Sequence, residues 1–233
     1  MSKDGSDGRP QRYIPTDIEV WKRSDRYHNE RLIGTPDASL VHAVESSAKG
    51  GLPNIAVSEA QAKFLQLLAR TFKAKRILEV GTLGGYSTIW LARALPEDGE
   101  LITLEISETH AEVARKNIAH AGLDSKVKVI VGPAVESLPK LEPSFDLAFI
   151  DADKQSNLEY FKEAKRLVRE GGVIIVDNVV RYGRVSDPEQ KDNATEGVRR
   201  LLDYIKDDKE VDATTLSTVG EKGYDGFLYA LRL

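Results

Sequence analysis

Two short polar runs contain residue types that bind hard cations, and each follows an apolar segment directly. Asp151-Ala-Asp-Lys154 is the first run, and Asp177-Asn178 is the second, 26 residues further along (177 − 151). If the preceding segments are neighbouring parallel strands, both runs lie at the carboxyl edge of one sheet, where open α/β folds bind ligands. Adjacent strands lie about 4.8 Å apart, so these side chains could converge on one ion.

The ligand chemistry of this set favours a hard divalent cation. Asp151, Asp177 and Asn178 offer only oxygen ligands, which suit Mg²⁺, Mn²⁺ or Ca²⁺ better than Zn²⁺. The chain has no cysteine, which excludes disulfides, thiolate metal sites and cysteine nucleophiles. Acids at strand ends also serve as simple helix caps. Three polar ligands at two strand ends, together with Lys154, favour the metal site over that alternative.

A glycine-rich run, Glu79-Val-Gly-Thr-Leu-Gly-Gly-Tyr-Ser87, lies between an apolar segment and a helical one. Glycine lets the backbone pass close to a ligand and enter a helix without a Cβ clash. The spacing is G-x-x-G-G, which differs from the G-x-G-x-x-G pattern of dinucleotide-binding turns. On its own such a turn is also explained as a tight connection.

Two acids near this turn indicate the kind of ligand. Glu79 precedes the first glycine, where a carboxylate would face a cation and repel a pyrophosphate. Glu105 ends the next apolar segment, where an acid can accept hydrogen bonds from a ribose diol; a cap for the following helix is the alternative role. A ligand with a ribose and a positive charge satisfies both acids, and S-adenosylmethionine has both features.

The elements that must position these residues follow from periodicity and capping signals. Thr16, with Glu19 three residues later, forms a capping-box pattern at the start of a helix, and Ser58 is expected to cap another. The expected helices are 16–33, 37–49 (ending at Gly50-Gly51), 59–72, 86–95, 108–121, 135–141, a segment ending at 168, and 195–206. The expected strands are 76–80, 100–104, 127–131, 145–150 and 172–176, followed by 212–219 and 227–231.

Alternating strands and helices predict an α/β fold with a mostly parallel sheet. The last two strands are separated by residues 220–226, which are too few for a helical crossover, so we expect them to pair antiparallel. The predicted architecture is a single Rossmann-like domain with seven strands, a terminal antiparallel hairpin and helices on both faces. We expect residues 1–15 to be a disordered leader and residues 16–233 to form the domain.

The net charge and the distribution of apolar residues indicate which classes of binding partner to exclude. The net charge is −4 and the isoelectric point is about 5.7, whereas nucleic-acid-binding domains carry a basic patch and a high isoelectric point. No apolar stretch approaches the roughly 20 residues of a membrane span. We therefore expect neither nucleic acid nor membrane as a partner, and a cytoplasmic location.

The runs Leu78–Ser87, Phe149–Lys154 and Val176–Asn178 resemble those of the cation-dependent class I S-adenosylmethionine O-methyltransferases. That family includes caffeoyl-CoA and catechol O-methyltransferases and many bacterial and fungal enzymes that act on small molecules. The similarity extends from about Ile55 to the C-terminus. The combination of D-A-D-K and D-N at this spacing is much more specific than the glycine run.

The resemblance implies an enzyme, an S-adenosylmethionine-dependent O-methyltransferase, with roles for particular residues. Asp151, Asp177 and Asn178 would bind Mg²⁺, with Mn²⁺ or Ca²⁺ as alternatives, and Lys154 would be the general base. It also implies a homodimer, with helices in residues 16–50 contributing to the dimer and to the acceptor pocket. Asp153 would hold the amino end of the cofactor, and the remaining cofactor-binding residues would be Ala56, Val57, Glu79, Gly81, Thr82, Ser87, Glu105, Ala134 and Asp151.

The predicted reaction moves the methyl group of S-adenosylmethionine to one hydroxyl of a metal-chelated vicinal diol on a small aromatic, catechol-like acceptor. A phenol with a pKa of about 10 is ionised in only about one molecule per thousand at neutral pH, a handicap of roughly 4 kcal/mol. A cation bound to both oxygens would lower that pKa. Two alternatives remain open: an NAD(P)-dependent oxidoreductase, which uses a similar strand–glycine–helix unit, and a catalytically idle cofactor-binding module.

Overall fold

A seven-stranded sheet forms the centre of the molecule. The structure is a computed structural model that describes residues 15–35 and 37–233. Five strands run parallel, and the last strand along the chain pairs antiparallel with two neighbours, so the predicted fold is confirmed. The sheet order is β3-β2-β1-β4-β5-β7-β6. The strands are β1 Arg76–Val80, β2 Glu100–Glu105, β3 Val127–Val131, β4 Phe145–Ile150, β5 Val168–Val176, β6 Val211–Gly220 and β7 Gly223–Arg232.

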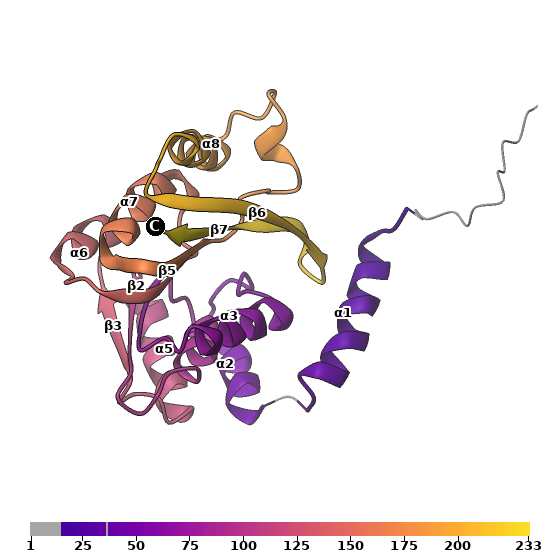
Figure 1. Ribbon diagram of the computed structural model, residues 1–233. Helices are drawn as coiled ribbons and strands as arrows, with labels where there is room; N and C mark the ends of the chain where they lie inside the picture. The colour runs from indigo at the N-terminus through magenta and orange to yellow at the C-terminus, as the bar shows by residue number, and fades with distance from the viewer. Residues whose placement is uncertain (1–14, 36) are drawn as a thin grey trace, which may run out of the picture.

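Helices cover both faces of this sheet (Figure 1). One face packs against α2, α3, α4 and α5, and the other packs against α6, α7 and α8. Short 3₁₀ turns occur at Leu138–Lys140, Lys154–Ser156 and Arg184–Ser186. The helices are α1 Ile18–Leu32, α2 Ala38–Lys49, α3 Glu59–Thr71, α4 Tyr86–Ala92, α5 Glu108–His120, α6 Ala134–Ser137, α7 Asn157–Leu167 and α8 Asn193–Lys206.

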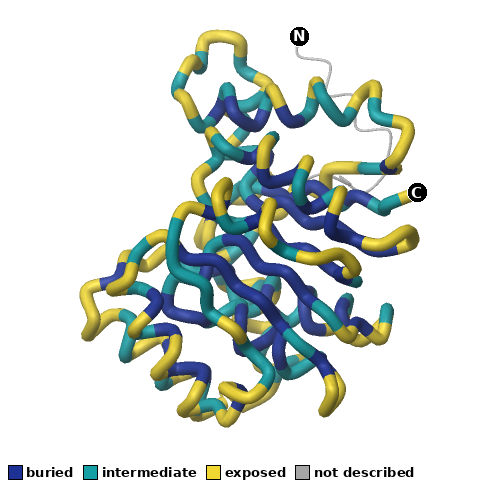
Figure 2. Tube along the Cα trace, turned by 90° about the vertical axis from the view of Figure 1, so that its left-hand side faces the viewer, coloured by how far each residue is buried: buried dark blue, intermediate teal, exposed yellow. Residues whose placement is uncertain are grey.

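The central strands are mostly apolar because both faces of the sheet are buried, although β1 also contains the buried Glu79. Successive side chains point to opposite faces, so Ile77 joins the core beneath α2–α5, while Leu78 joins the core beneath α6–α8. Ile175 and Ile174 alternate in the same way. Figure 2 shows these strands as the continuous buried centre of the molecule. This double burial fixes the register of the strands that end at the polar runs.

Capping residues explain most helix starts, with one correction to the sequence prediction. The Ser58 hydroxyl accepts from the N–H of Gln61 and caps α3, as predicted. At α1, however, Asp17 is the cap, because its carboxylate accepts from the N–H groups of Glu19 and Val20. The Thr16 hydroxyl instead accepts from the Trp21 indole at 2.8 Å. Aspartate and threonine both favour this position, and here the adjacent acid occupies it.

The terminal hairpin is tighter than predicted. Residues 220–226 were expected to separate the two strands, but Gly220 pairs with Gly223 and leaves a turn of only Glu221 and Lys222. Gly223 has a φ of +97°, which glycine adopts without strain. The strands therefore extend to the turn and project beyond the rest of the sheet toward α1 (Figure 1).

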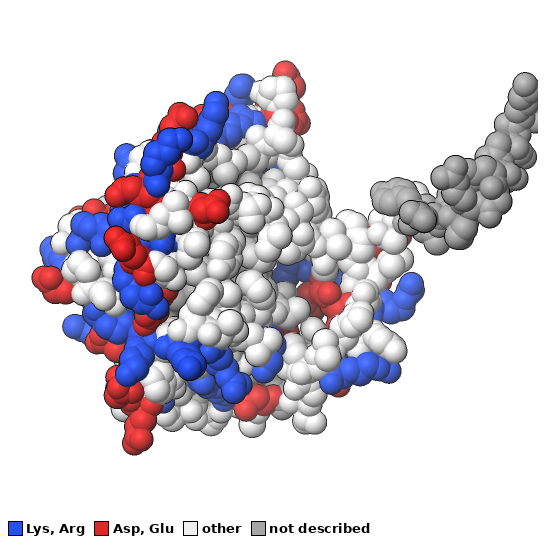
Figure 3. Space-filling model, in the orientation of Figure 1, with Lys and Arg blue, Asp and Glu red and all other residues white. Residues whose placement is uncertain are grey.

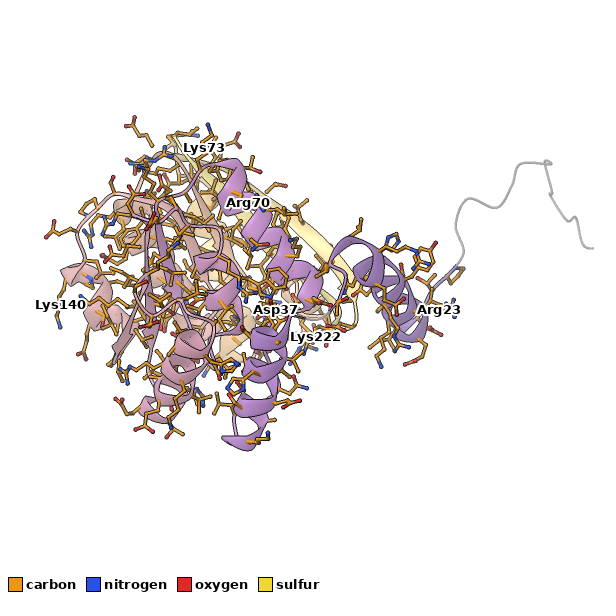
Figure 4. The ribbon with its side chains drawn as sticks, turned by 90° about the horizontal axis from the view of Figure 1, so that it is seen from below. Arg23, Asp37, Arg70, Lys73, Lys140 and Lys222 are labelled. Atoms are coloured by element: carbon orange, nitrogen blue, oxygen red, sulfur yellow. The ribbon has the colours of Figure 1, made fainter. Side chains whose placement is uncertain are left out.

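The N-terminal helix stands apart from the remaining helices. Viewed from below, α1, which carries Arg23, is separated from α2, which begins after Asp37 (Figure 4). One contact with the hairpin is made by Asp25, whose carboxylate accepts from the N–H of Glu221 at 2.9 Å. Residues 1–14 of the expected leader lie outside the described residues. Among the helices described, none has the length and apolar character needed to cross a bilayer.

Candidate active site

The two acidic runs identified in the sequence end neighbouring strands of the sheet. The main-chain N–H of Asp151 donates to the carbonyl of Val80 at 2.8 Å, and that of Asp177 donates to the carbonyl of Ile150 at 2.9 Å. Each strand ladder thus continues for one residue beyond its strand. Asp151 and Asp177 therefore lie side by side at the carboxyl edge of β4 and β5, as the sequence predicts.

Lys154 forms an ion pair at this edge. Its Nζ atom lies 2.7 Å from Oδ1 of Asp151, and only 10% of the lysine side chain is exposed. The backbone of Lys154 packs against α8 at Gly197, where a built Cβ atom would lie 2.1 Å from the Lys154 carbonyl oxygen. Only glycine permits this approach, and it holds the 3₁₀ turn that carries the lysine against α8.

Asp177 is the most buried member of the group, with 5% of the residue exposed. Burial raises its pKa to about 7, and the neighbouring Asp151 carboxylate adds to the rise. The Lys154 ammonium and the Gln61 amide from α3 act in the opposite direction. Two carboxylates thus share one ammonium in a poorly hydrated position, and this arrangement favours an additional cation.

The fit of a divalent ion depends on these acids and on Asn178. Within residues 15–35 and 37–233, no cluster of three or more His, Cys, Asp or Glu side chains could hold a metal ion. The candidate set contains only two carboxylates, and further ligands must come from the Asn178 amide oxygen or from water. Hard oxygen donors of this kind suit Mg²⁺, which usually keeps several waters. The residues therefore fit a partly hydrated Mg²⁺ ion.

The loop after β5 has an unusual backbone. Asn178, Arg181 and Tyr182 have φ values of 56°, 54° and 58°, in a left-handed region that costs non-glycine residues roughly 1–2 kcal/mol each. Asp225 of β7 holds the loop, because its Oδ1 atom accepts from the N–H groups of Val180 at 3.2 Å and Arg181 at 2.7 Å. Sequence reasoning missed Asp225, since pairing between distant segments leaves no local pattern.

The glycine turn meets the acidic edge directly. Gly81 has a φ of +102°, and a built Cβ atom would lie 2.1 Å from the carbonyl oxygen of Asp151. Gly85 has a φ of +82° and lies at the start of α4. Both positions require glycine, and the first brings the predicted cofactor turn into contact with the predicted metal edge.

Glu105 supports the same turn from β2. Its Oε2 atom accepts from the N–H groups of Thr82 at 3.2 Å and Leu83 at 2.8 Å, and its Oε1 atom accepts from the N–H of Ser107 at 3.0 Å. The cap of α5 is Ser107, which accepts from the N–H of His110. The alternative of Glu105 as that cap is therefore incorrect, and its carboxylate lies at the turn.

Glu79 lies beneath the turn and is fully buried. Burial raises its pKa to about 7, although three hydroxyls donate to the carboxylate and partly offset that rise. The donors are Ser87 at 2.7 Å, Thr88 at 2.5 Å and Thr103 at 2.7 Å. Glu79 thus organises the base of the turn through hydroxyl groups, and Ser87 is the half-buried member of that network.

The remaining predicted cofactor residues lie on nearby segments. Val57 is buried in the connection before α3, Ala134 begins α6, and the Thr82 hydroxyl lies 2.5 Å from that of Thr103. The Asp153 carboxylate accepts from Ser156 at 2.6 Å and from Tyr160 at 2.5 Å. These two bonds tie Asp153 to the 3₁₀ turn Lys154–Ser156 and to the start of α7. Ala56 is half-buried beside Val57.

A mixed-charge pocket of about 430 Å³ lies between α1, the start of α3 and the hairpin turn. Figure 3 shows charged side chains of both signs in the hollow between α1 and the rest of the molecule. Burial raises the pKa of Glu59, and the nearby Glu221 carboxylate adds to this effect. The lining residues are Lys22, Arg26, Asn29, Glu30, Gly34, Glu59, Glu221 and Lys222.

Comparisons with known proteins agree on one family. Residues 35–232 match a family model described as O-methyltransferase. A catechol O-methyltransferase of Niastella koreensis is 48% identical, with 91% of this chain and 98% of the relative covered. A catechol O-methyltransferase of Mycobacterium tuberculosis is 46% identical, with 96% and 99% covered. The crystal structure of an O-methyltransferase from Bacillus cereus in complex with SAH is 48% identical, has a TM-score of 0.90, and covers 93% of this chain and 100% of its own.

Proposed function

Because the chain belongs to the O-methyltransferase family, we propose that it transfers the methyl group of S-adenosylmethionine to one hydroxyl of a vicinal diol on a small aromatic acceptor. The catechol O-methyltransferases similar to it support this acceptor class. The observation that carries the proposal is the contact of Gly81 with Asp151, because it joins a cofactor turn to an acidic, cation-favouring edge.

The cofactor would bind over the glycine turn. The similar Bacillus cereus structure is a complex with SAH, the product that remains when S-adenosylmethionine loses its methyl group. Glu105, at the end of β2, has the position of an acid that accepts ribose hydroxyls. The NAD(P)-dependent alternative loses support, because relatives at 46% and 48% identity along almost the whole chain are methyltransferases. The idle module loses support for the same reason.

Asp151, Asp177 and Asn178 would hold a divalent ion beside this cofactor. When bound, such an ion would stabilise the ionised form of a chelated hydroxyl and orient the diol. Asp177 suits this role because burial and the Asp151 carboxylate already disfavour its charge without a cation, raising its pKa to about 7. Mg²⁺ is the ion we propose, with Mn²⁺ and Ca²⁺ as alternatives.

Lys154 would take the proton that leaves the acceptor hydroxyl. Its Nζ atom is held at the carboxyl edge by Asp151 and is mostly shielded from solvent. As a base it must act as the neutral amine, and it becomes an ammonium when it binds the proton. The hydroxyl oxygen would then attack the sulfonium methyl in line. Holding the two reactants in that alignment would supply a large part of the rate.

We also propose that the enzyme is a homodimer, with helices in residues 16–50 contributing to the dimer and to the acceptor pocket. No residue of α1 is buried within the single chain, and Ile18 and Leu32 are 41% and 77% exposed. Strand β6 is one of the two edges of the sheet, and its residues 213–219 carry no charge. Light scattering at micromolar concentration tests this, and a monomeric mass would contradict it.

A methyl-transfer assay tests the main proposal. The purified chain, radiolabelled S-adenosylmethionine and Mg²⁺ are combined with catechols, caffeoyl esters or hydroxylated polyketides, and each reaction is repeated in EDTA. Label should appear in an acceptor with two adjacent hydroxyls and should disappear with EDTA. An acceptor with a single hydroxyl is the matched control and should remain unlabelled. Absence of transfer to every diol, or full transfer in EDTA, would contradict the proposal.

A further inference from the structure

The side chain of Asn117 joins the glycine turn to two helices. Asn117 lies on α5 and is completely buried. Its Nδ2 atom donates to the carbonyl of Gly84 at 2.8 Å and approaches the carbonyl of Ala43, on α2, at 3.4 Å. Its Oδ1 atom accepts from the Ser46 hydroxyl, also on α2. A single amide thus connects α2, α5 and the turn between β1 and α4.

Helix α2 also touches the turn directly. A Cβ atom built at Gly84 would lie 2.0 Å from the Ser47 hydroxyl oxygen, so α2 fills the space that a side chain would need. The Ser47 hydroxyl donates to the Ala43 carbonyl at 2.6 Å and is fixed on its own helix. The turn therefore contacts α2 at Gly84, the same residue whose carbonyl accepts from Asn117.

The start of α2 is fixed by α4, the helix that the glycine turn enters. Asp37 caps α2 by accepting from the N–H groups of Ser39 and Leu40. The same carboxylate accepts from the Arg93 guanidinium at 2.8 Å, and Arg93 is the residue that ends α4. Figure 4 shows Asp37 at the start of α2. Helix α2 thus contacts Gly84 in the glycine turn and Arg93 at the end of α4.

The turn is held from two sides in complementary ways. Glu105 accepts from the N–H groups of Thr82 and Leu83, while Asn117 donates to the carbonyl of Gly84. These bonds orient successive peptide groups of the turn. Loss of the Asn117 donor would leave a buried carbonyl unpaired, at a cost of about 1–3 kcal/mol. The turn could recover that cost by rotating the peptide toward solvent.

We propose that Asn117 is a positioning residue that holds the glycine turn in its cofactor-binding conformation, with α2 as its support. This inference rests on the proposed binding of S-adenosylmethionine at the turn. It assigns to α2 a role on the cofactor side of the site, in addition to the acceptor and dimer roles proposed for the N-terminal helices. A purely structural Asn117 would stabilise the α2–α5 contact without affecting cofactor affinity.

Three variants of the full chain test whether Asn117 positions the glycine turn or only stabilises the α2–α5 contact. Asn117→Ala removes both the donor and the acceptor. Asn117→Asp keeps nearly the same shape and an acceptor for Ser46, but places an oxygen against the Gly84 carbonyl. Thr195→Val is the matched control, because Thr195 is also fully buried and hydrogen-bonded, to Asp192 at the start of α8.

SAH affinity, measured by titration calorimetry, is the first readout. Asn117→Ala and Asn117→Asp should each weaken SAH binding by about tenfold or more, equivalent to 1.4 kcal/mol. The KM for S-adenosylmethionine should rise in parallel, while the acceptor KM and the kcat at saturating cofactor stay within about twofold, the pattern of lost uniform binding. Thr195→Val should lower the Tm without weakening SAH binding.

Hydrogen exchange of the unliganded proteins is the second readout. The amides of residues 82–85 should exchange faster in Asn117→Ala, while those of strand β1 should not change. If Asn117→Ala fails to fold, Ser46→Ala provides the same test with a smaller expected effect, because Asn117 keeps its donor to Gly84.

The outcomes distinguish this inference from the proposed function. A wild-type chain that does not bind SAH would refute the proposed function. If the wild type binds SAH and both Asn117 variants bind it with the same affinity as the wild type, the positioning role is refuted but the proposed function is not. Equal weakening by Thr195→Val would also refute it, since the loss would then follow general destabilisation.

Discussion

The Lys154 ammonium lies 2.7 Å from the Asp151 carboxylate, at the point where strand β4 ends. This pair joins the proposed proton acceptor to a proposed metal ligand through one contact. A substitution at either residue therefore alters the surroundings of the other, and the two roles must be separated by different measurements. Proton transfer is visible in kcat, whereas ion binding is visible in the concentration of metal that the enzyme requires.

Replacement of Lys154 tests its proposed role as the base. Lys154→Met should lower kcat by about 10²–10⁴-fold, the usual contribution of general acid–base catalysis. SAH affinity should stay close to that of the wild type, because the glycine turn is unchanged. Lys162→Met, at an exposed lysine on α7, is the matched control and should retain full activity. Near-normal turnover of Lys154→Met would show that another group takes the proton.

Replacement of Asp177 tests the proposed ion site. EDTA should abolish wild-type activity, and added Mg²⁺ should restore it. Asp177→Asn removes one of the two carboxylates, so the Mg²⁺ concentration for half-maximal activity should rise by about tenfold or more, because the charge of the ligands sets the affinity of such a site. Asp124→Asn, at an exposed loop position, should leave the Mg²⁺ titration unchanged. Superimposable titrations of wild type and Asp177→Asn would exclude Asp177 as a ligand.

Replacement of Glu105 tests the cofactor side. Glu105→Gln keeps one side-chain acceptor oxygen but removes the charge that strengthens bonds from N–H and hydroxyl donors. The KM for S-adenosylmethionine should rise by about tenfold, while the acceptor KM changes little. Glu108→Gln alters an exposed acid on α5 that pairs with Arg115, and it serves as the control. An increase in the acceptor KM alone would show that Glu105 acts on acceptor binding and not on cofactor binding.

Replacement of Asp225 tests the support of the loop after β5. Asp225→Ala removes the acceptor for the Val180 and Arg181 N–H groups, so the left-handed residues of this loop should relax. The acceptor KM should rise by about tenfold, with SAH affinity unchanged. Asp225→Asn keeps the accepting oxygen and should recover much of the loss. Weaker SAH binding in Asp225→Ala would mean that the loop also shapes the cofactor site.

Acid stability should depend on an ion pair between Lys165 on α7 and Asp208, just after α8. The Lys165 ammonium lies 2.5 Å from the Asp208 carboxylate, and their side chains are 13% and 6% exposed. Burial is the largest single influence and would raise the pKa of Asp208, but the hydrogen bonds from Lys165 and the Glu210 N–H, together with the Lys165 charge, hold the pKa below its ordinary value of 3.8. A lowered carboxylate pKa adds stability above the ordinary value and loses it as the pH falls through the folded-state value.

The wild type should therefore be more stable than Asp208→Asn at pH 6, by about 1–3 kcal/mol, less than for a fully buried pair. This difference should shrink as the pH falls below 3.8. Urea unfolding at several pH values measures it. Asp203→Asn, an exposed acid on α8, provides the control. A difference that stays constant down to pH 2 would show that the Asp208 charge is not involved.

Local sequence signals predicted the strands that form the site. The runs 76–80 and 145–150 match β1 and β4 residue for residue, because both faces of the sheet are buried along these strands. The same logic placed Asp151 and Asp177 at one edge. Capping residues predicted the start of α1 less well, since both Thr16 and Asp17 suit that position; Asp17 caps the helix, and the Thr16 hydroxyl accepts from the Trp21 indole instead.

Contacts between distant segments were not predictable from one sequence. Asn117 and Gly84 are 33 residues apart, and Asp225 and Val180 are 45 residues apart. Each pair depends on how two helices or a loop and a hairpin pack in three dimensions. The left-handed backbone at Arg181 likewise has no local signal, because the carboxylate that accepts from its N–H belongs to Asp225, 44 residues away.

The insertion of β7 between β5 and β6 has a consequence for how the chain matures. Residues Val173–Val176 find their antiparallel partners only among Leu228–Leu231. The strand that presents Asp177 therefore lacks one neighbour until the ribosome has released those late residues, and pairing across such a long separation is slow. Until β7 is in place, the unpaired backbone of β5 is a free strand edge that can pair with other chains and aggregate. A premature stop codon before residue 228 would yield a chain without the strand that pairs with β5.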